Sequence, residues 1–296
     1  MGSQAYAWWY VDALSDCGTQ GLTIIGFVGS VFSPYYKRSG RADPADHAAM
    51  NVALYGPRGR WAMTERRRHA LTRSADTLAI GPSAMRWTGS KLVIDLAERG
   101  APLPWPVRGR VTVHPEIACP TAFALAPNGS HHWRPFAPRA RVEAEFTAPA
   151  LRWHGTGYFD MNWGREPLEA GFLDWQWSRA HVGREAAVIY EGVRADGARF
   201  GSALRFGADG SAQEEELPLI APLPRTRWLL HRHTRADSGL VGVRRTWEDS
   251  PFYARSELAT RLFGSQVTAV HESLDLRRFD SGIVQWMLPY RMPRAR

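Results

Sequence analysis

Short stretches in which apolar and polar residues alternate recur along almost the whole chain. Residues 8–13 are aromatic and β-branched, and residues 22–32 form a longer run of the same kind with glycines inside it. Such side chains favour strands, and a period of two turns one face of a strand towards a core. Residues 51–55 and 60–64 flank the sequence Gly-Pro-Arg-Gly at 56–59, which is typical of a β-hairpin.

The pattern continues to the C-terminal end, and no segment shows a sustained helical period. Many short strands separated by glycine-containing turns are typical of β-sandwiches and β-barrels. The strands are too many for one small barrel, so we expect an all-β fold of two β-barrel-like halves with a boundary between residues 165 and 171. The further expected strands are 77–80, 85–87, 92–96, 109–114, 142–146, 155–164, 172–180, 186–192, 200–206, 228–234, 240–247, 253–262, 266–274 and 283–287.

Residues 115–140 differ from the rest because they show little periodicity. They contain the sequence Pro-Asn-Gly-Ser-His-His-Trp at 127–133. An irregular stretch of this length in a compact protein is often functional. We therefore expect this segment to contribute side chains to a site.

The most unusual expected strand is 155–164, with the sequence GTGYFDMNWG. On a strand, Tyr158, Asp160 and Asn162 would share one face, which places a carboxyl group among aromatic side chains. Burial among apolar groups raises the pKa of a carboxyl group, which can then stay protonated near neutral pH. We interpret Asp160 as a proton donor to an apolar substrate. The alternative is a structural carboxylate that is hydrogen-bonded to a nearby loop.

Other acidic and histidine residues give weaker signals. The other carboxylates beside aromatic residues are Asp12, Glu65 and Asp174, and we hold Asp174 as the reserve acid. His231 and His233 would share one face of a strand and could begin a metal site. Because no clear third ligand accompanies them, we expect surface or interface residues and no metal.

The composition narrows the class of protein. A hydrophobic content of 44% with 22% charged residues, over 296 residues, is that of an ordinary globular protein with a substantial core. Thirteen tryptophans could be core residues, or could line a site for a large apolar ligand. The net charge of +8 comes almost entirely from arginine and favours anionic partners. It fits either a solvated surface or a face attracted to anionic lipid, and no nucleic-acid-binding module accompanies it.

The chain gives no sign of a disulfide framework, a secretory signal or a membrane span. Cys17 and Cys119 are far apart, and the first residues lack a basic segment followed by an apolar run. No uninterrupted apolar run approaches the ~20 residues that a spanning helix needs. We therefore expect a cytoplasmic protein that is soluble or peripheral.

Six segments resemble the carotenoid 1,2-hydratases, the hydroxyneurosporene synthases of photosynthetic bacteria. They are WWYVDALSD at 8–16, GLTIIGFVGSVFSPYY at 21–36, WAMTER at 61–66, YFDMNWG at 158–164, DWQWSR at 174–179 and EDSPFYARS at 248–256. The resemblance covers almost the whole chain. It implies two lipocalin-like (calycin-type) β-barrel domains in tandem, which we place at residues 1–168 and 169–296.

The resemblance also implies a reaction: addition of water, without a cofactor, to the terminal C1–C2 double bond of an acyclic carotenoid such as neurosporene or lycopene. The residues that match the family's proposed catalytic set are His131, Trp133, Tyr158 and Asp160. Asp160 would protonate C2, the aromatic rings of Trp133 and Tyr158 would stabilise the tertiary cation at C1, and His131 would take a proton from water. Taken singly, His131 fits a surface loop and the two aromatic residues fit a core.

Two other functions use the same features. A lipocalin-like carrier would hold a hydrophobic ligand unchanged, and a cyclase or isomerase would use the same acid but exclude water. The expected partners are an acyclic carotenoid, water and a membrane surface as the source of substrate, without nucleic acid. We therefore expect the protein to be peripheral on the inner, photosynthetic membrane.

Overall fold

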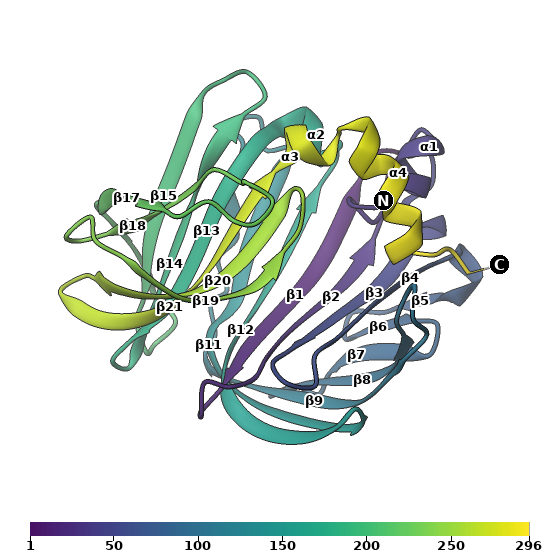
Figure 1. Ribbon diagram of the computed structural model, residues 1–296, viewed down its shortest axis with the longest axis horizontal. Helices are drawn as coiled ribbons and strands as arrows, with labels where there is room; N and C mark the ends of the chain where they lie inside the picture. Colours follow the sequence, from purple (N-terminus) through teal and green to yellow (C-terminus); the bar gives the residue numbers. More distant parts are fainter. Residues whose placement is uncertain (296) are drawn as a thin grey trace. The chain divides into compact units, whose positions relative to one another are not determined.

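The computed structural model describes residues 1–295, which form an all-β protein with a few short helices (Figure 1). The all-β prediction is confirmed. The chain divides into two compact units. The first comprises Met1–Glu116, Thr121–Pro167 and the chain from Trp286 onward, and the second comprises Ile117–Pro120 and Leu168–Gln285.

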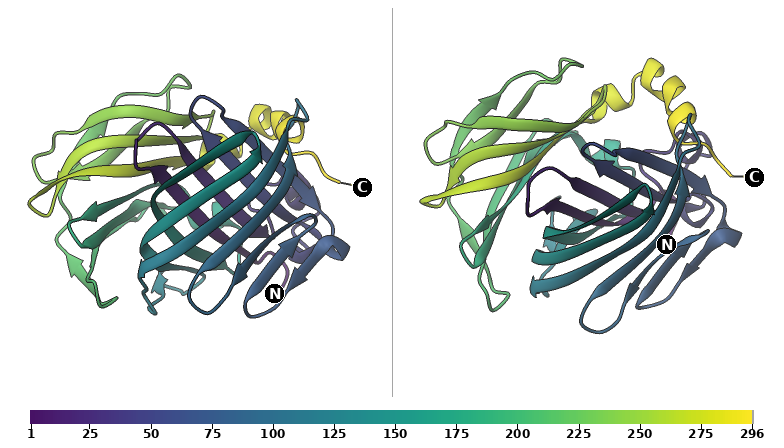
Figure 2. Two further views of the ribbon diagram at one scale, coloured as in Figure 1. Left: turned by 90° about the horizontal axis from the view of Figure 1, so that it is seen from below. Right: turned by 60° about the horizontal axis from the view of Figure 1, so that its bottom comes forward.

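The first unit is built on a twelve-stranded antiparallel sheet in the order β4-β3-β2-β1-β12-β11-β9-β8-β7-β6-β5, with β10 paired to β11. The sheet curls into a nearly closed barrel, because β4 approaches β8 and β3 approaches β6 (Figure 2). The strands are β1 (Tyr6–Ser15), β2 (Gly21–Val28), β3 (Ala48–Tyr55), β4 (Arg60–Arg66), β5 (Leu71–Arg73), β6 (Thr77–Ile80), β7 (Ser83–Trp87), β8 (Leu92–Arg99), β9 (Pro106–Ile117), β10 (Phe123–Ala124), β11 (His131–Ala148) and β12 (Ala150–Gly164). The helical turns are α1 (Pro34–Arg38), η1 (Pro44–Asp46) and η2 (Arg68–Ala70).

The second unit contains a seven-stranded sheet, in the order β16-β15-β14-β13-β21-β20-β19, and the separate pair β17-β18. Its strands are β13 (Phe172–Val182), β14 (Glu185–Arg194), β15 (Arg199–Phe206), β16 (Ala212–Glu215), β17 (Leu219–Leu223), β18 (Arg232–Ala236), β19 (Gly242–Asp249), β20 (Tyr253–Leu262) and β21 (Ser265–Asp275). The helices in this part of the chain are α2 (Leu168–Gly171), α3 (Leu276–Phe279) and α4 (Gly282–Arg291). The boundary between the two units falls inside α4.

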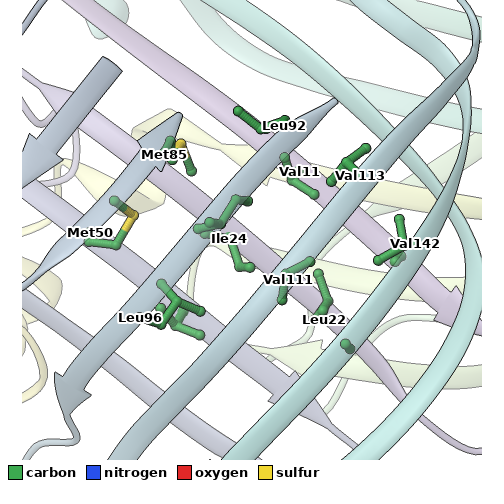
Figure 3. Packing of buried hydrophobic residues seen from close by; sticks show 14 of the residues in the cluster. Val11, Leu22, Ile24, Met50, Met85, Leu92, Leu96, Val111, Val113 and Val142 are labelled. Atoms are coloured by element: carbon green, nitrogen blue, oxygen red, sulfur yellow. The ribbon is translucent and has the colours of Figure 1, made fainter. Parts of the chain in front are cut away.

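The interior of the first unit is lined by aliphatic side chains from one face of each strand. Val11, Ile24, Met50, Val111 and Val142 are fully or almost fully buried in this hydrophobic cluster (Figure 3). Because the side chains of a strand alternate between its faces, the same strands present a second set of residues on the outer face. Burial of each large aliphatic side chain stabilises the fold by about 1.5–3 kcal/mol.

Four predictions of local structure are wrong. The strand predicted at 228–234 begins only at Arg232, as β18, because Leu229 adopts a φ of 59° that interrupts the extended chain. Residues 283–287 belong to the helix α4 and not to a strand, because apolar residues on both sides of α4 hide its helical period. Residues 131–140 belong to the long strand β11, so the irregular segment is shorter than predicted. β2 ends at Val28, because Gly29 adopts a φ of 67° that turns the chain.

Among residues 1–295 the longest helix is α4, with ten residues. No helix in this range is long and apolar enough to cross a bilayer.

Candidate active site

Strand register places the predicted residues on one face of the first unit's sheet. β1, β12 and β11 are neighbours, and Tyr10 lies opposite Asp160 while Asp12 lies opposite Tyr158. On the other side of β12, Trp133 of β11 lies opposite Asn162. Directly opposed residues of antiparallel strands project to the same face. The prediction that Tyr158, Asp160 and Asn162 share a face therefore agrees with the structure.

This face is the outer one. Phe159 and Val11, which alternate with the site residues along β12 and β1, belong to the hydrophobic cluster inside the barrel. Lipocalins hold their ligands inside the barrel, so the interior would be the expected place for a substrate. Here the predicted site residues point away from the interior.

Asp160 lies in a buried hydrogen-bond network with Trp133 and Tyr158. Oδ2 of Asp160 accepts hydrogen bonds from Tyr158 Oη at 2.8 Å and from Trp133 Nε1 at 2.9 Å. Trp133 Nε1 also lies 3.1 Å from Tyr158 Oη. Asp160 is 4% exposed, Trp133 1% and Tyr158 0%. Burial, followed by the charge of Asp160, holds the pKa of Tyr158 well above its usual value, so the phenol keeps its proton.

Asn162 completes the arrangement on the other carboxyl oxygen. Its Nδ2 donates to Asp160 Oδ1 over 3.1 Å. The side chain is 3% exposed, and its Oδ1 has no hydrogen-bond partner among the described residues. Buried polar atoms are normally satisfied by protein or by ordered water. This oxygen can therefore accept a hydrogen bond from a water molecule beside Asp160.

His131 lies in a second network on the same face. Its Nδ1 is 2.7 Å from Tyr6 Oη, and its Nε2 is 3.0 Å from Oε1 of Glu166, which also accepts a hydrogen bond from Ser130 Oγ at 2.6 Å. Burial lowers the pKa of His131, and the negative charge of Glu166 opposes that shift. An imidazole with a lowered pKa is neutral near neutral pH and can take up a proton.

Gly164 of β12 leaves room for the side chains of His131 and Tyr6, which lie on either side of this strand, to contact each other. Gly164 lies opposite Tyr6 on one side and opposite His131 on the other. A Cβ atom at Gly164 would lie 2.5 Å from the ring of Tyr6 and 2.9 Å from His131 Nδ1. Gly164 ends β12 and leaves space for the rings of Tyr6 and His131 to meet over it.

The structure thus brings Asp160, Tyr158 and Trp133 into direct contact and sets His131 in the adjacent network. His131 and Trp133 lie on β11, the strand next to that of Asp160, and not in an irregular segment. The sequence reasoning missed Tyr6 and Glu166. Tyr6 continues the alternation of residues 8, 10 and 12 by one step, and this was the available signal.

The weaker candidates have other surroundings. Asp174, the reserve acid, lies on β13, where burial raises its pKa and Arg277 Nη2 is 3.0 Å from its Oδ2. Glu65 is paired with His47 and Arg294 at 2.9 Å. No cluster of three or more side chains with metal-binding groups occurs in residues 1–295, and His233 lies 3.4 Å from Glu191.

A family model and individual relatives both place the chain in the same family. The model of the family described as carotenoid hydratase CrtC matches residues 24–296. The acyclic carotenoid 1,2-hydratase of Thiocapsa roseopersicina is 50% identical over 296 residues, which cover 98% of this chain and 73% of that protein. The enzyme of the same name from Cereibacter sphaeroides is 47% identical over 274 residues, covering 92% and 98%.

Solved structures with low sequence identity share the fold. Kievitone hydratase from Nectria haematococca has a TM-score of 0.55 at 10% identity, over 92% of this chain and 89% of that one. CghA has a TM-score of 0.52 at 13% identity, over 92% and 88%. At this level of identity the likeness concerns the fold alone.

Proposed function

As a member of the carotenoid hydratase CrtC family, the protein is a hydro-lyase of carotenoid biosynthesis, and we propose that it works by acid catalysis at Asp160. The substrate would be an acyclic carotenoid such as neurosporene or lycopene. Water would add to its terminal C1–C2 double bond and give a tertiary 1-hydroxy carotenoid. The observation that carries the mechanism is the buried network of Asp160, Tyr158 and Trp133.

The first step is proton transfer from Asp160 to C2 of the alkene. In the protonated acid, the hydroxyl of Tyr158 can rotate and accept a hydrogen bond from the proton on Oδ2 until that proton passes to C2. As the proton leaves, negative charge develops on the carboxylate, where Trp133, Tyr158 and Asn162 have donors already placed. Preorganised donors aimed at a developing charge lower the barrier. These hydrogen bonds would therefore stabilise the charge that Asp160 acquires during the transfer.

The second step is stabilisation of the tertiary cation at C1. The faces of aromatic rings attract cations by about 0.5–2 kcal/mol each, depending on desolvation. Trp133 and Tyr158 would supply the nearest rings, and the ring of Tyr10 packs edge-on against Tyr158 at 6.1 Å.

The third step is capture of the cation by water. Asn162 Oδ1 would hold the water, and the proton that the water loses would pass through the hydroxyl of Tyr6 to Nδ1 of His131, whose lowered pKa leaves the ring neutral. The carboxylate of Glu166 would stabilise the imidazolium that results. Glu166 is about one-third exposed, so the proton has an outlet to solvent.

The remaining parts of the proposal concern the architecture and location of the protein. We propose that residues 1–168 and 169–296 form two lipocalin-like domains, and the change of compact unit between Pro167 and Leu168 supports this boundary. A long polyene partitions into lipid, so the protein would take its substrate from a membrane surface as a peripheral protein of the photosynthetic membrane. No cofactor enters any of the three steps.

The test is turnover of lycopene or neurosporene, with product identified by mass. We expect the product to gain the mass of one water, Asp160→Asn to lose activity, and Asp174→Asn to keep it. Unchanged product mass with altered retention would indicate a cyclase or isomerase. Binding of an unaltered ligand would indicate a carrier. Full activity of both Asp160→Asn and His131→Ala would refute the assignment of the site.

A further inference from the structure

The helix α4 presents a continuous apolar stripe to solvent. Ile283, Trp286, Met287 and Tyr290 are 69%, 65%, 36% and 59% exposed. Residues spaced by three, four and seven positions lie on one side of a helix. We call this set the α4 outer face. Large exposed apolar groups that form one patch, unlike scattered ones, mark a surface that contacts something else.

The opposite side of α4 is already covered by the protein. Val284 and Leu288 are 4% and 7% exposed, and Met292 just beyond the helix is 5% exposed. A helix that is apolar on all sides is normally buried on all sides or lies in lipid. In α4 the protein covers only one side.

The chain just after α4 is anchored to the first unit. Glu65 N donates to Pro293 O at 3.0 Å, and Ala295 N donates to Glu65 O at 2.8 Å. The guanidinium of Arg294 pairs with Glu65 at 2.9 Å and with Asp46 at 2.6 Å. These contacts hold the end of α4, so the outer face is carried on a fixed support and not on a loose tail.

Basic side chains lie near the C-terminal end of this face. Residues 276–295 contain four arginines and one acidic residue, Asp280, and two of these arginines, Arg277 and Arg294, are paired with carboxylates. Arg291, at the end of α4, lies over the ring of Trp61 at 4.5 Å. Arg294 contacts the ring of Tyr35 in α1, whose last turn carries Lys37 and Arg38. Figure 1 shows α1 next to α4.

We propose that the α4 outer face docks on an anionic lipid surface. Tryptophan and tyrosine prefer the membrane–water interface, and arginine at the rim of an apolar face attracts anionic headgroups. The four side chains expose about 460 Å² if each free side chain offers about 200 Å². A stable protein interface needs about 800 Å² per partner. The face is therefore too small for a second protein and suits a lipid surface.

This inference rests on the proposed function for its purpose, the delivery of a lipid-soluble polyene, but docking can be measured without turnover. The experiment is flotation of the full-length protein with phosphatidylcholine vesicles, with and without phosphatidylglycerol. We expect the wild type to bind the anionic vesicles and to lose binding at high salt. The double variant Trp286→Gln/Tyr290→Gln should bind at least about tenfold more weakly.

The matched control is Trp105→Gln, since Trp105 is 51% exposed in a loop of the first unit and is not part of α4. It should bind vesicles like the wild type. Three results would overturn the inference: no binding by the wild type, equal binding by the double variant, or a dimer in solution that the double variant converts to monomer.

Activity separates this inference from the proposed function. The double variant should hydrate detergent-dispersed lycopene like the wild type and vesicle-embedded lycopene more slowly. If no variant hydrates lycopene in either form, the proposed function fails while the flotation result still decides the docking. If hydration occurs and the double variant is equally active on both forms, docking through α4 is refuted.

Discussion

The variant Tyr158→Phe, which lacks one oxygen atom, tests whether the hydrogen-bond network around Asp160 is catalytic or only structural. Tyr158→Phe keeps the aromatic ring beside Asp160 but removes the hydroxyl that lies 2.8 Å from Asp160 Oδ2 and 3.1 Å from Trp133 Nε1. A hydrogen bond to a charged group contributes about 1.5–3 kcal/mol. If that energy is realised as the carboxylate forms, kcat should fall by about 10- to 100-fold.

The assay is the initial rate of hydration over a range of substrate concentrations, which separates kcat from KM. We expect most of the loss in kcat, because the hydroxyl acts on the acid and not on binding of the polyene. The matched control is Tyr36→Phe. Tyr36 is 1% exposed, and its hydroxyl donates to the backbone oxygen of Ala5 at 2.8 Å.

Both variants should lower the free energy of unfolding by a similar amount, about 1 kcal/mol, in chemical denaturation. Only Tyr158→Phe should lose kcat. If both variants lost stability and neither lost kcat, the network around Asp160 would be structural, and the acid would have to be sought elsewhere.

Three further predictions concern other parts of the chain. Burial lowers the pKa of His271 to about 3, so the unfolded chain binds one more proton than the folded protein between about pH 6.5 and 3. The free energy of unfolding therefore falls as the pH falls through that window. In acid denaturation, His271→Asn should remove up to roughly 4–5 kcal/mol of this pH dependence. Glu166→Gln removes a charge that raises the pKa of His131, so the acid limb of kcat/KM against pH should move to lower pH, and an unmoved limb would argue against His131 as the base. Ile24→Ala in the barrel interior should cost about 2–5 kcal/mol in thermal unfolding without loss of kcat, whereas a loss of kcat in the folded variant would show that the interior reaches the site.

The sequence was sufficient for the fold class and for the face that carries Asp160, because both follow from a period of two along single strands. It was insufficient for the neighbours of that face. That Trp133 lies beside Asp160 depends on the pairing of β11 with β12, and a shift by one residue would have turned Trp133 to the interior. Tyr6 and Glu166 contact His131 from more than thirty residues away, which no local pattern specifies.

The helix α4 was missed for a different reason. A helical period is visible in a sequence when one side is polar, and α4 is apolar on both sides. The feature that obscured it in the sequence is the same feature that motivates the proposed docking to lipid. The prediction of α4 failed because surface helices are recognised in a sequence by one polar side that faces water, and α4 has no such side.

The opposite orientation of core and site on shared strands has a consequence for engineering. In β1 and β12 the even-numbered residues Tyr10, Asp12, Tyr158 and Asp160 face outward, and their odd-numbered neighbours fill the barrel. Along these two strands, even-numbered residues therefore form the proposed site, and odd-numbered residues stabilise the barrel. A library that randomises only outward positions beside the four could change which polyene is accepted while every aliphatic contact of the barrel stays in place.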